Sequence, residues 1–188
     1  MPALILTGSP REDGVTARLA ACFERVWGEA RGGPVCRFDA YALAARPCSH
    51  CGFCKTVSGC VHSDLDGFDA ALRQADFVAV AAPVYMLGFP APLKAILDRS
   101  QRYFEEKFCR GIALPTGGPR GALLLTACGS GGADCTSMLE RQLGMALPLW
   151  GARLVRTIAA RNTDRIPPDF AACEAEMRAV FQASAQGA

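Results

Sequence analysis

The sequence lacks three features that would each have pointed to a class of function. It has no strong charge excess: 20 Lys and Arg against 18 Asp and Glu give a formal net charge of +2, which is too small to predict nucleic-acid binding. It has no long apolar run, because prolines 83, 90 and 92 interrupt the longest uncharged stretch, and a membrane span needs about 20 apolar residues. The first residues lack the basic region of a signal peptide, so we expect a cytoplasmic protein.

Cysteine, in contrast, is abundant, with ten in 188 residues. A small secreted domain would use them as a disulfide scaffold, but this chain is large enough to build an apolar core. In a reducing compartment, clustered cysteines more often bind metal or perform redox chemistry. Cys22, Cys36 and Cys173 are scattered, and we interpret them as small buried residues.

Apolar runs alternate with helical patterns along the whole chain. The runs predict strands at 3–8, 34–40, 76–84, 121–127 and 152–160, and the patterns predict helices at 16–30, 65–75, 91–106, 133–149 and 168–184. Strands that are apolar throughout indicate a parallel sheet covered on both faces. We therefore predict one doubly wound α/β domain over residues 1–188. Its ligands should lie beyond the carboxyl ends of the strands, above all at the loops after strands one, three and four.

The loop "GSPREDGVT", residues 8–16, joins the first strand to the first helix. Ser9 and Thr16 supply hydroxyls there, Arg11 supplies a charged donor, and the helix N-terminus supplies backbone N–H groups for an anion. Val15 stands where a Walker A loop carries lysine, so the pattern suits a phosphate monoester better than a triphosphate. A plain strand–helix turn shaped by Gly14 is the alternative.

Two further loops could border a ligand. "APVYMLGFPAPLKAILDR", residues 82–99, places apolar and aromatic side chains beside prolines and a glycine, a composition that can cover a flat ring. The alternative is that Tyr85 and Met86 belong to the core. "CGSGGAD", residues 128–134, is a small-residue loop that either lets the backbone approach a ligand closely or forms a flexible turn.

These loops, with the cysteines between them, resemble the flavodoxin-like NAD(P)H-dependent FMN reductases. Within that family the chain is most similar to the iron-sulfur flavoprotein branch, over roughly residues 3–133. The resemblance implies a five-stranded sheet in the order 2-1-3-4-5. It also implies phosphate contacts from Ser9, Arg11 and Thr16, with Gly14 shaping the loop and Val15 replacing an asparagine that the family often carries. The loop after strand three would border the isoalloxazine ring, and the loop after strand four would close its other side; these contacts would come from Pro83, Val84, Tyr85, Met86, Leu87, Gly129, Ser130 and Gly131.

The stretch "PCSHCGFCKTVSGC" lies in a loop at residues 47–62. Its cysteines are Cys48, Cys51 and Cys54 at C-x2-C-x2-C spacing, followed by Cys60. Four thiolates can hold a [4Fe–4S] cluster, and the resemblance favours this interpretation. Structural zinc, free thiols and a disulfide framework remain alternatives.

The resemblance implies that FMN performs the chemistry, so we expect no catalytic side chain. With a cluster, the protein would be an electron-transfer iron-sulfur flavoprotein that passes electrons between the [4Fe–4S] cluster and FMN. Without one, it would be an NAD(P)H-dependent FMN, quinone or azo reductase. A redox- or metal-sensing module that uses Cys48–Cys60 is a second alternative. Small-molecule or protein electron donors and acceptors would be its partners, NAD(P)H is a possible donor, and the resemblance implies a homodimer or homotetramer.

Overall fold

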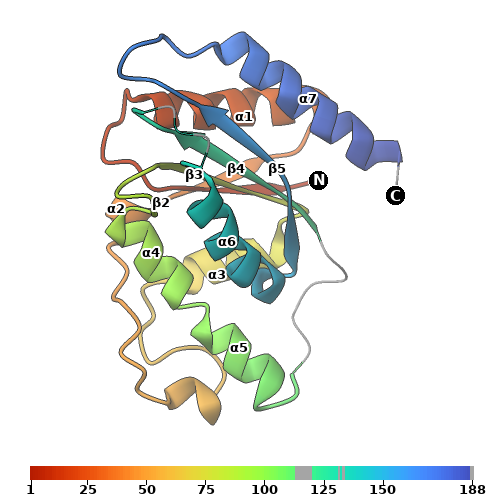
Figure 1. The fold of residues 1–188 in the computed structure, drawn as a ribbon. Helices are drawn as coiled ribbons and strands as arrows, with labels where there is room; N and C mark the ends of the chain where they lie inside the picture. The colour runs from red at the N-terminus through yellow and green to blue at the C-terminus, as the bar shows by residue number, and fades with distance from the viewer. Residues whose placement is uncertain (113–119, 131, 133, 187–188) are drawn as a thin grey trace.

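The computed structural model describes residues 1–112, 120–130, 132 and 134–186. Its central element is a sheet of five parallel strands (Figure 1). The strand order is β2-β1-β3-β4-β5, which confirms the predicted flavodoxin-like α/β fold. The strands are β1 (Ala3–Thr7), β2 (Val35–Asp39), β3 (Phe77–Pro83), β4 (Arg120–Ala127) and β5 (Ala152–Ala160).

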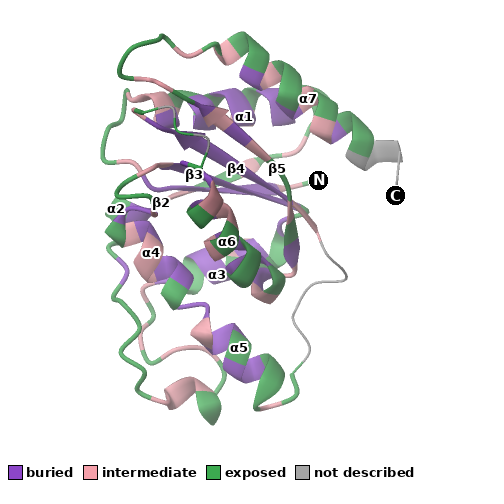
Figure 2. Cartoon of the chain, viewed as in Figure 1, coloured by how far each residue is buried: buried purple, intermediate pink, exposed green. Residues whose placement is uncertain are grey.

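Helices cover both faces of the sheet, so the apolar side chains of the central strands are buried on both sides (Figure 2). Phe23 and Trp27 of α1 (Val15–Arg31) meet Phe181 of α7 (Phe170–Gln186) in an aromatic core on one face. The opposite face is covered by α3 (Asp66–Gln74), α4 (Ala91–Asp98) and α6 (Ser137–Ala146). On that same side α5 (Gln101–Phe108) lies beyond these helices, away from the sheet.

The structure divides the predicted helix at 91–106 into α4 and α5. The chain turns at Arg99 and Ser100. There the Arg99 guanidinium donates a hydrogen bond to the backbone oxygen of Arg46, in a loop distant in the sequence. The helix predicted at 133–149 begins at Ser137 and gives way to a 3-10 turn, Leu147–Trp150, because Pro148 cannot supply a backbone donor. A short helix, α2 (Ala40–Leu43), was not predicted, although Asp39 caps it.

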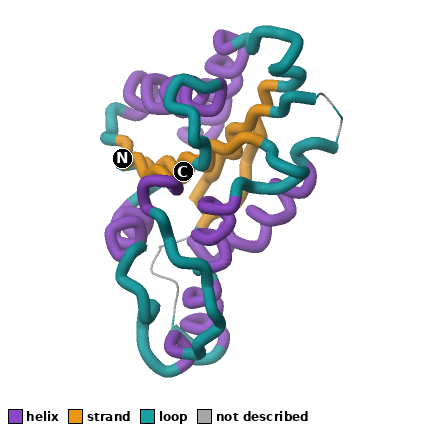
Figure 3. The backbone as a smooth tube through the Cα atoms, turned by 90° about the vertical axis from the view of Figure 1, so that its left-hand side faces the viewer, coloured by secondary structure: helices purple, strands orange, loops and turns teal. Residues whose placement is uncertain are grey.

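Between α2 and α3 the chain makes a long excursion to the end of the molecule farthest from the sheet (Figure 3). This excursion carries the cysteine motif and one short 3-10 turn, η1 (Phe53–Lys55). Of the scattered cysteines, Cys22 and Cys173 are buried as predicted, but the prediction for Cys36 is wrong, because it lies exposed on the edge strand β2. No helix in the described part of the chain is long and apolar enough to cross a membrane.

Candidate functional site

The loop between β1 and α1 leaves the first turn of α1 open at the carboxyl edge of the sheet. Gly14 precedes the helix, and no side chain among the described residues caps this end. The Arg11 backbone N–H donates to Ser9 Oγ at 3.3 Å, which holds the loop in a tight turn. The Arg11 side chain is exposed, and Thr16 is buried in the first turn. An uncapped helix N-terminus beside an exposed guanidinium suits an anion.

The loop after β3 is a two-residue turn that projects its side chains outward. Tyr85 N–H donates to Gly88 O at 3.0 Å, and Gly88 N–H donates back to Tyr85 O at 2.8 Å. Met86 and Leu87 between them have positive φ angles of 49° and 60°, as in a type I′ turn. Met86 is 100% exposed and Tyr85 44%, so the alternative that these two residues belong to the core is wrong.

We expect Leu87→Gly to raise the free energy of unfolding by about 1 kcal/mol, because a β-carbon at positive φ is unfavourable and glycine has none. Urea denaturation at neutral pH measures the change. Leu87→Ala is the matched control, since it removes the rest of the side chain but keeps the β-carbon. An equal gain from the alanine variant would contradict backbone strain as the cause.

The loops after β4 and β5 lie against each other at the same edge. Thr163 N–H donates to Cys128 O at 3.0 Å, and Asp164 N–H donates to Gly129 O at 3.4 Å. A β-carbon at position 129 would collide with the Asp164 carboxylate where that side chain now lies, so glycine permits this close approach. Sequence reasoning missed Thr163 and Asp164. The sequence did contain a signal for these two residues, because they follow the fifth strand at the edge where ligands bind in this fold.

Two adjoining cavities open where these loops meet, and they share Val84 and Gly129. All the flavin-site residues predicted from the sequence that the structure describes line one or both of them, whereas Gly131 lies outside the described residues. The first cavity is lined by Ser9, Arg11, Gly14, Val15, Thr16, Pro83, Val84, Tyr85, Ala127, Gly129, Thr163 and Asp164. The second is lined by Val84, Met86, Leu87, Cys128, Gly129, Ser130 and Cys135.

The four clustered cysteines line a separate hollow at the far end of the molecule, where η1 packs against α5. Positive φ angles at His50 and Gly52 curl the chain between successive cysteines, so that the motif borders one space. Of the residues described, none that lines this hollow also lines the two cavities at the sheet edge. The hollow is bordered by Cys48, Ser49, His50, Cys51, Gly52, Phe53, Cys54, Lys55, Cys60, Val61, His62, Arg99, Gln101, Arg102 and Glu105.

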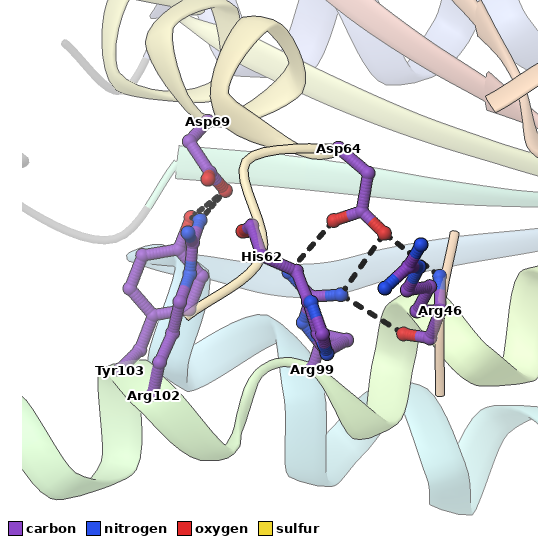
Figure 4. Close-up of polar contacts among 7 residues, drawn as sticks. All are labelled: Arg46, His62, Asp64, Asp69, Arg99, Arg102 and Tyr103. Atoms are coloured by element: carbon purple, nitrogen blue, oxygen red, sulfur yellow. Dashed lines mark hydrogen bonds and ion pairs between the residues drawn. The ribbon is translucent and has the colours of Figure 1, made fainter. Parts of the chain in front are cut away.

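Arg99 holds the two ends of the cysteine loop together (Figure 4). Its guanidinium donates to Arg46 O at 2.9 Å before the motif and to His62 O at 3.1 Å after it. It also pairs with Asp64, at 2.9 Å between Nη2 and Oδ1. The second oxygen of Asp64 accepts the Arg46 backbone N–H at 2.8 Å.

Four further polar contacts fix α5, two of them to the cysteine loop and two to α3. The Glu106 carboxylate accepts from Ser58 Oγ at 2.9 Å and from the Gly59 backbone N–H at 3.0 Å. Arg102 pairs with Asp69 of α3, and Tyr103 donates to the same carboxylate (Figure 4). Burial raises the pKa of the Tyr103 hydroxyl, which therefore stays a donor at neutral pH. The loop is thus attached at its two ends by Arg99, and at Ser58 and Gly59 by Glu106.

The donor chemistry of the hollow fits a metal centre. All ten cysteines lie in the described part of the chain and are free thiols. Burial, followed by the charges of Glu105, Cys48 and Cys60, raises the pKa of the Cys54 thiol, so metal binding there would release a proton. The described residues nevertheless contain no group of three or more His, Cys, Asp or Glu side chains placed to hold a metal ion. Ligation would require the thiol side chains to turn toward one centre.

Comparisons with known proteins identify one family and several relatives that resemble parts of this chain. The family model described as NADPH-dependent FMN reductase matches residues 1–161. An iron-sulfur flavoprotein of Methanosarcina thermophila is 44% identical over 79 residues, which cover 39% of this chain and 41% of that protein. One from Methanocaldococcus jannaschii is 32% identical over 103 residues, which cover 54% of this chain and 52% of that protein. The chain therefore matches about half the length of these relatives or less.

Solved structures share the fold across almost the whole chain. An NAD(P)H:quinone oxidoreductase from Methanothermobacter marburgensis superposes with a TM-score of 0.74 at 18% identity, covering 96% of this chain and 94% of that one. An azoreductase from Bacillus anthracis superposes with a TM-score of 0.69 at 17% identity, covering 96% and 98%. At these identities the likeness establishes the architecture alone.

Proposed function

Because the chain belongs to the NADPH-dependent FMN reductase family, we propose that it is an FMN-dependent oxidoreductase that exchanges electrons with a [4Fe–4S] cluster held by its cysteine loop. One observation carries the flavin half of this proposal. Three loops far apart in the sequence, each of which the sequence motifs predict to contact flavin, meet at the two adjoining cavities.

The phosphate of FMN would lie at the uncapped start of α1. Backbone N–H groups of the first turn and the Ser9 hydroxyl would donate to its oxygens, and the Arg11 guanidinium would neutralise its charge. The Asp164 carboxylate borders the same cavity and can accept hydrogen bonds from the hydroxyl groups of a ribityl chain.

The isoalloxazine ring would lie across the shared wall of the two cavities. Val84 N–H is already bonded to Ala127 O at 2.9 Å, so the strand end that presents this wall is rigid. Tyr85, Met86 and Leu87 would cover one side of the ring and exclude water from it. Bound FMN would supply the transfer of one or two electrons, and the protein would supply its position and surroundings.

Arg11→Ala tests the flavin half of the proposal. We expect the affinity for FMN to fall roughly 10- to 100-fold, the loss typical of one charge-assisted hydrogen bond, while the affinity for riboflavin, which lacks the phosphate, stays unchanged. Quenching of flavin fluorescence measures both affinities. Arg18→Ala is the matched control, because Arg18 lies over the Phe170 ring and does not line the cavity. An equal loss for both flavins would contradict a phosphate site at Arg11.

The cluster half of the proposal is supported by the shared hollow and by the similarity to proteins named iron-sulfur flavoproteins. Cys48, Cys51, Cys54 and Cys60 would be the ligands, and a bound cluster would add a one-electron carrier to the protein. Lys55 and Arg99 also border the hollow, and their charges would offset the negative charge of a cluster with four thiolates.

A cluster-free reductase of quinones, azo compounds or free flavin is the second candidate function. In that case the four cysteines of the loop would remain free thiols, and metal analysis decides between the two candidates. In either case residues 1–188 would act as one flavin-binding unit.

A further inference from the structure

Two buried thiols touch each other beside the proposed ring site. Cys128 follows β4 and Cys135 precedes α6, and their sulfur atoms are 2.8 Å apart. Both side chains are nearly inaccessible to bulk solvent, at 2% and 6% exposure, yet both line the cavity that also presents Met86 and Leu87. A disulfide bond is about 2.05 Å long, so a small movement would join the two sulfur atoms. The flavin contacts proposed above make no use of either thiol.

A guanidinium lies against this pair. Arg161, at the end of β5, donates from Nη1 to Cys135 Sγ at 3.1 Å and to Gly132 O at 2.9 Å. A positive charge at this distance stabilises negative charge on the sulfur while an S–S bond forms or breaks. Burial, and then the contact with Cys135, raise the pKa of Cys128 to about 12. The Cys128 thiol donates to Cys135 Sγ, the same sulfur that accepts from Arg161 Nη1.

We propose that Cys128 and Cys135 form a redox-active dithiol that exchanges two electrons with a flavin bound in the adjoining cavities. This inference rests on the proposed function. In the oxidising direction the two thiols lose two electrons and two protons as the S–S bond forms. The oxidised flavin takes up the two electrons and the two protons and becomes dihydroflavin. In the reverse direction the dihydroflavin returns two electrons and two protons, and the S–S bond breaks. The pair would let the protein store one more electron pair next to the ring.

An anaerobic reductive titration tests this exchange. Flavin-loaded protein is first oxidised with glutathione disulfide, freed of it by gel filtration, and titrated with dithionite while the flavin absorbance is followed. We expect the unaltered protein to consume one two-electron equivalent per chain more than Cys135→Ala. Cys173→Ala is the matched control: this thiol is similarly buried, at 8% exposure, but lies on α7, and its removal should leave the titre unchanged. Any cluster contributes equally to all three proteins and cancels in the difference.

A second measurement does not depend on flavin binding. The purified full chain is treated with glutathione disulfide, its remaining thiols are alkylated with iodoacetamide, and its peptides are examined by mass spectrometry. We expect a Cys128–Cys135 cross-link that dithiothreitol reverses, while Cys173 is alkylated after denaturation. Flavin binding with equal titres for the unaltered protein and Cys135→Ala overturns the exchange. Alkylation of both thiols without a cross-link overturns the dithiol itself. A protein that takes up no flavin overturns the proposed function and the exchange with it, and the cross-link then decides the dithiol separately.

Discussion

Cys51→Ser should abolish iron binding while FMN remains bound. Cys51 is the central cysteine of the C-x2-C-x2-C motif, and it borders the hollow that contains the other three. Fe–S clusters select soft thiolate ligands over the hard oxygen of serine, so we expect the cluster to be lost. Because the flavin cavities share no lining residue with the hollow among those described, flavin binding should persist.

Metal and sulfide analysis of protein purified without oxygen measures this effect. The unaltered protein should contain about four iron and about four acid-labile sulfide per chain, as a cubane requires. Cys36→Ser is the matched control, because Cys36 is also exposed but lies on β2, outside the hollow. Zinc without sulfide would indicate a structural zinc site in place of the cluster. Absence of both iron and zinc would favour the cluster-free reductase. Loss of flavin together with iron would show that the loop is needed for folding.

Arg99→Met should lower the free energy of unfolding by about 3 kcal/mol, at the lower end of the range for broken buried ion pairs. The Arg99 side chain is only 2% exposed, and its removal leaves the Asp64 carboxylate without its cation and the carbonyl groups of Arg46 and His62 without this donor. Asp64 is 21% exposed, so water can solvate part of the abandoned charge, which places the loss at the lower end. Urea denaturation measures the change.

Lys94→Met provides the matched control for the Arg99 variant. Lys94 also forms an ion pair, with Asp98 at 2.6 Å, but both side chains are more than 40% exposed. Exposed pairs contribute about 1 kcal/mol at most, so this variant should change the free energy of unfolding by less than that. Similar losses in the two variants would contradict the role of Arg99 as the residue that closes the cysteine loop.

The effect of Arg99→Met should also depend on pH. Burial acts to raise the pKa of the Asp64 carboxyl, but hydrogen bonds from Arg99 and from the Arg46 backbone outweigh it and hold the pKa below its ordinary value. A carboxyl whose pKa is lower in the folded state stabilises the fold above its unfolded pKa, about 3.9, and this contribution is lost as the pH falls through the folded pKa. The difference in unfolding free energy between the two proteins should therefore shrink below about pH 4.

Local pattern was sufficient to predict the strands and the loops that border the two adjoining cavities. Strands such as β1 and β3 are apolar at nearly every position because both faces of the sheet are covered, and this signal is continuous in the sequence. The position of the loop after each strand follows from the strand itself. The motif of four cysteines was equally visible, because its spacing is short and needs no partner from elsewhere in the chain.

Tertiary structure alone decided the contacts between distant segments. Arg99 and Asp64 are 35 positions apart, and their pairing depends on how α4 packs beside the cysteine loop. The contact of Cys128 with Cys135 depends likewise on where α6 begins relative to β4. Helical and strand periodicity describe how each element buries its own face, and they contain no information about which polar side chains meet once the faces are packed.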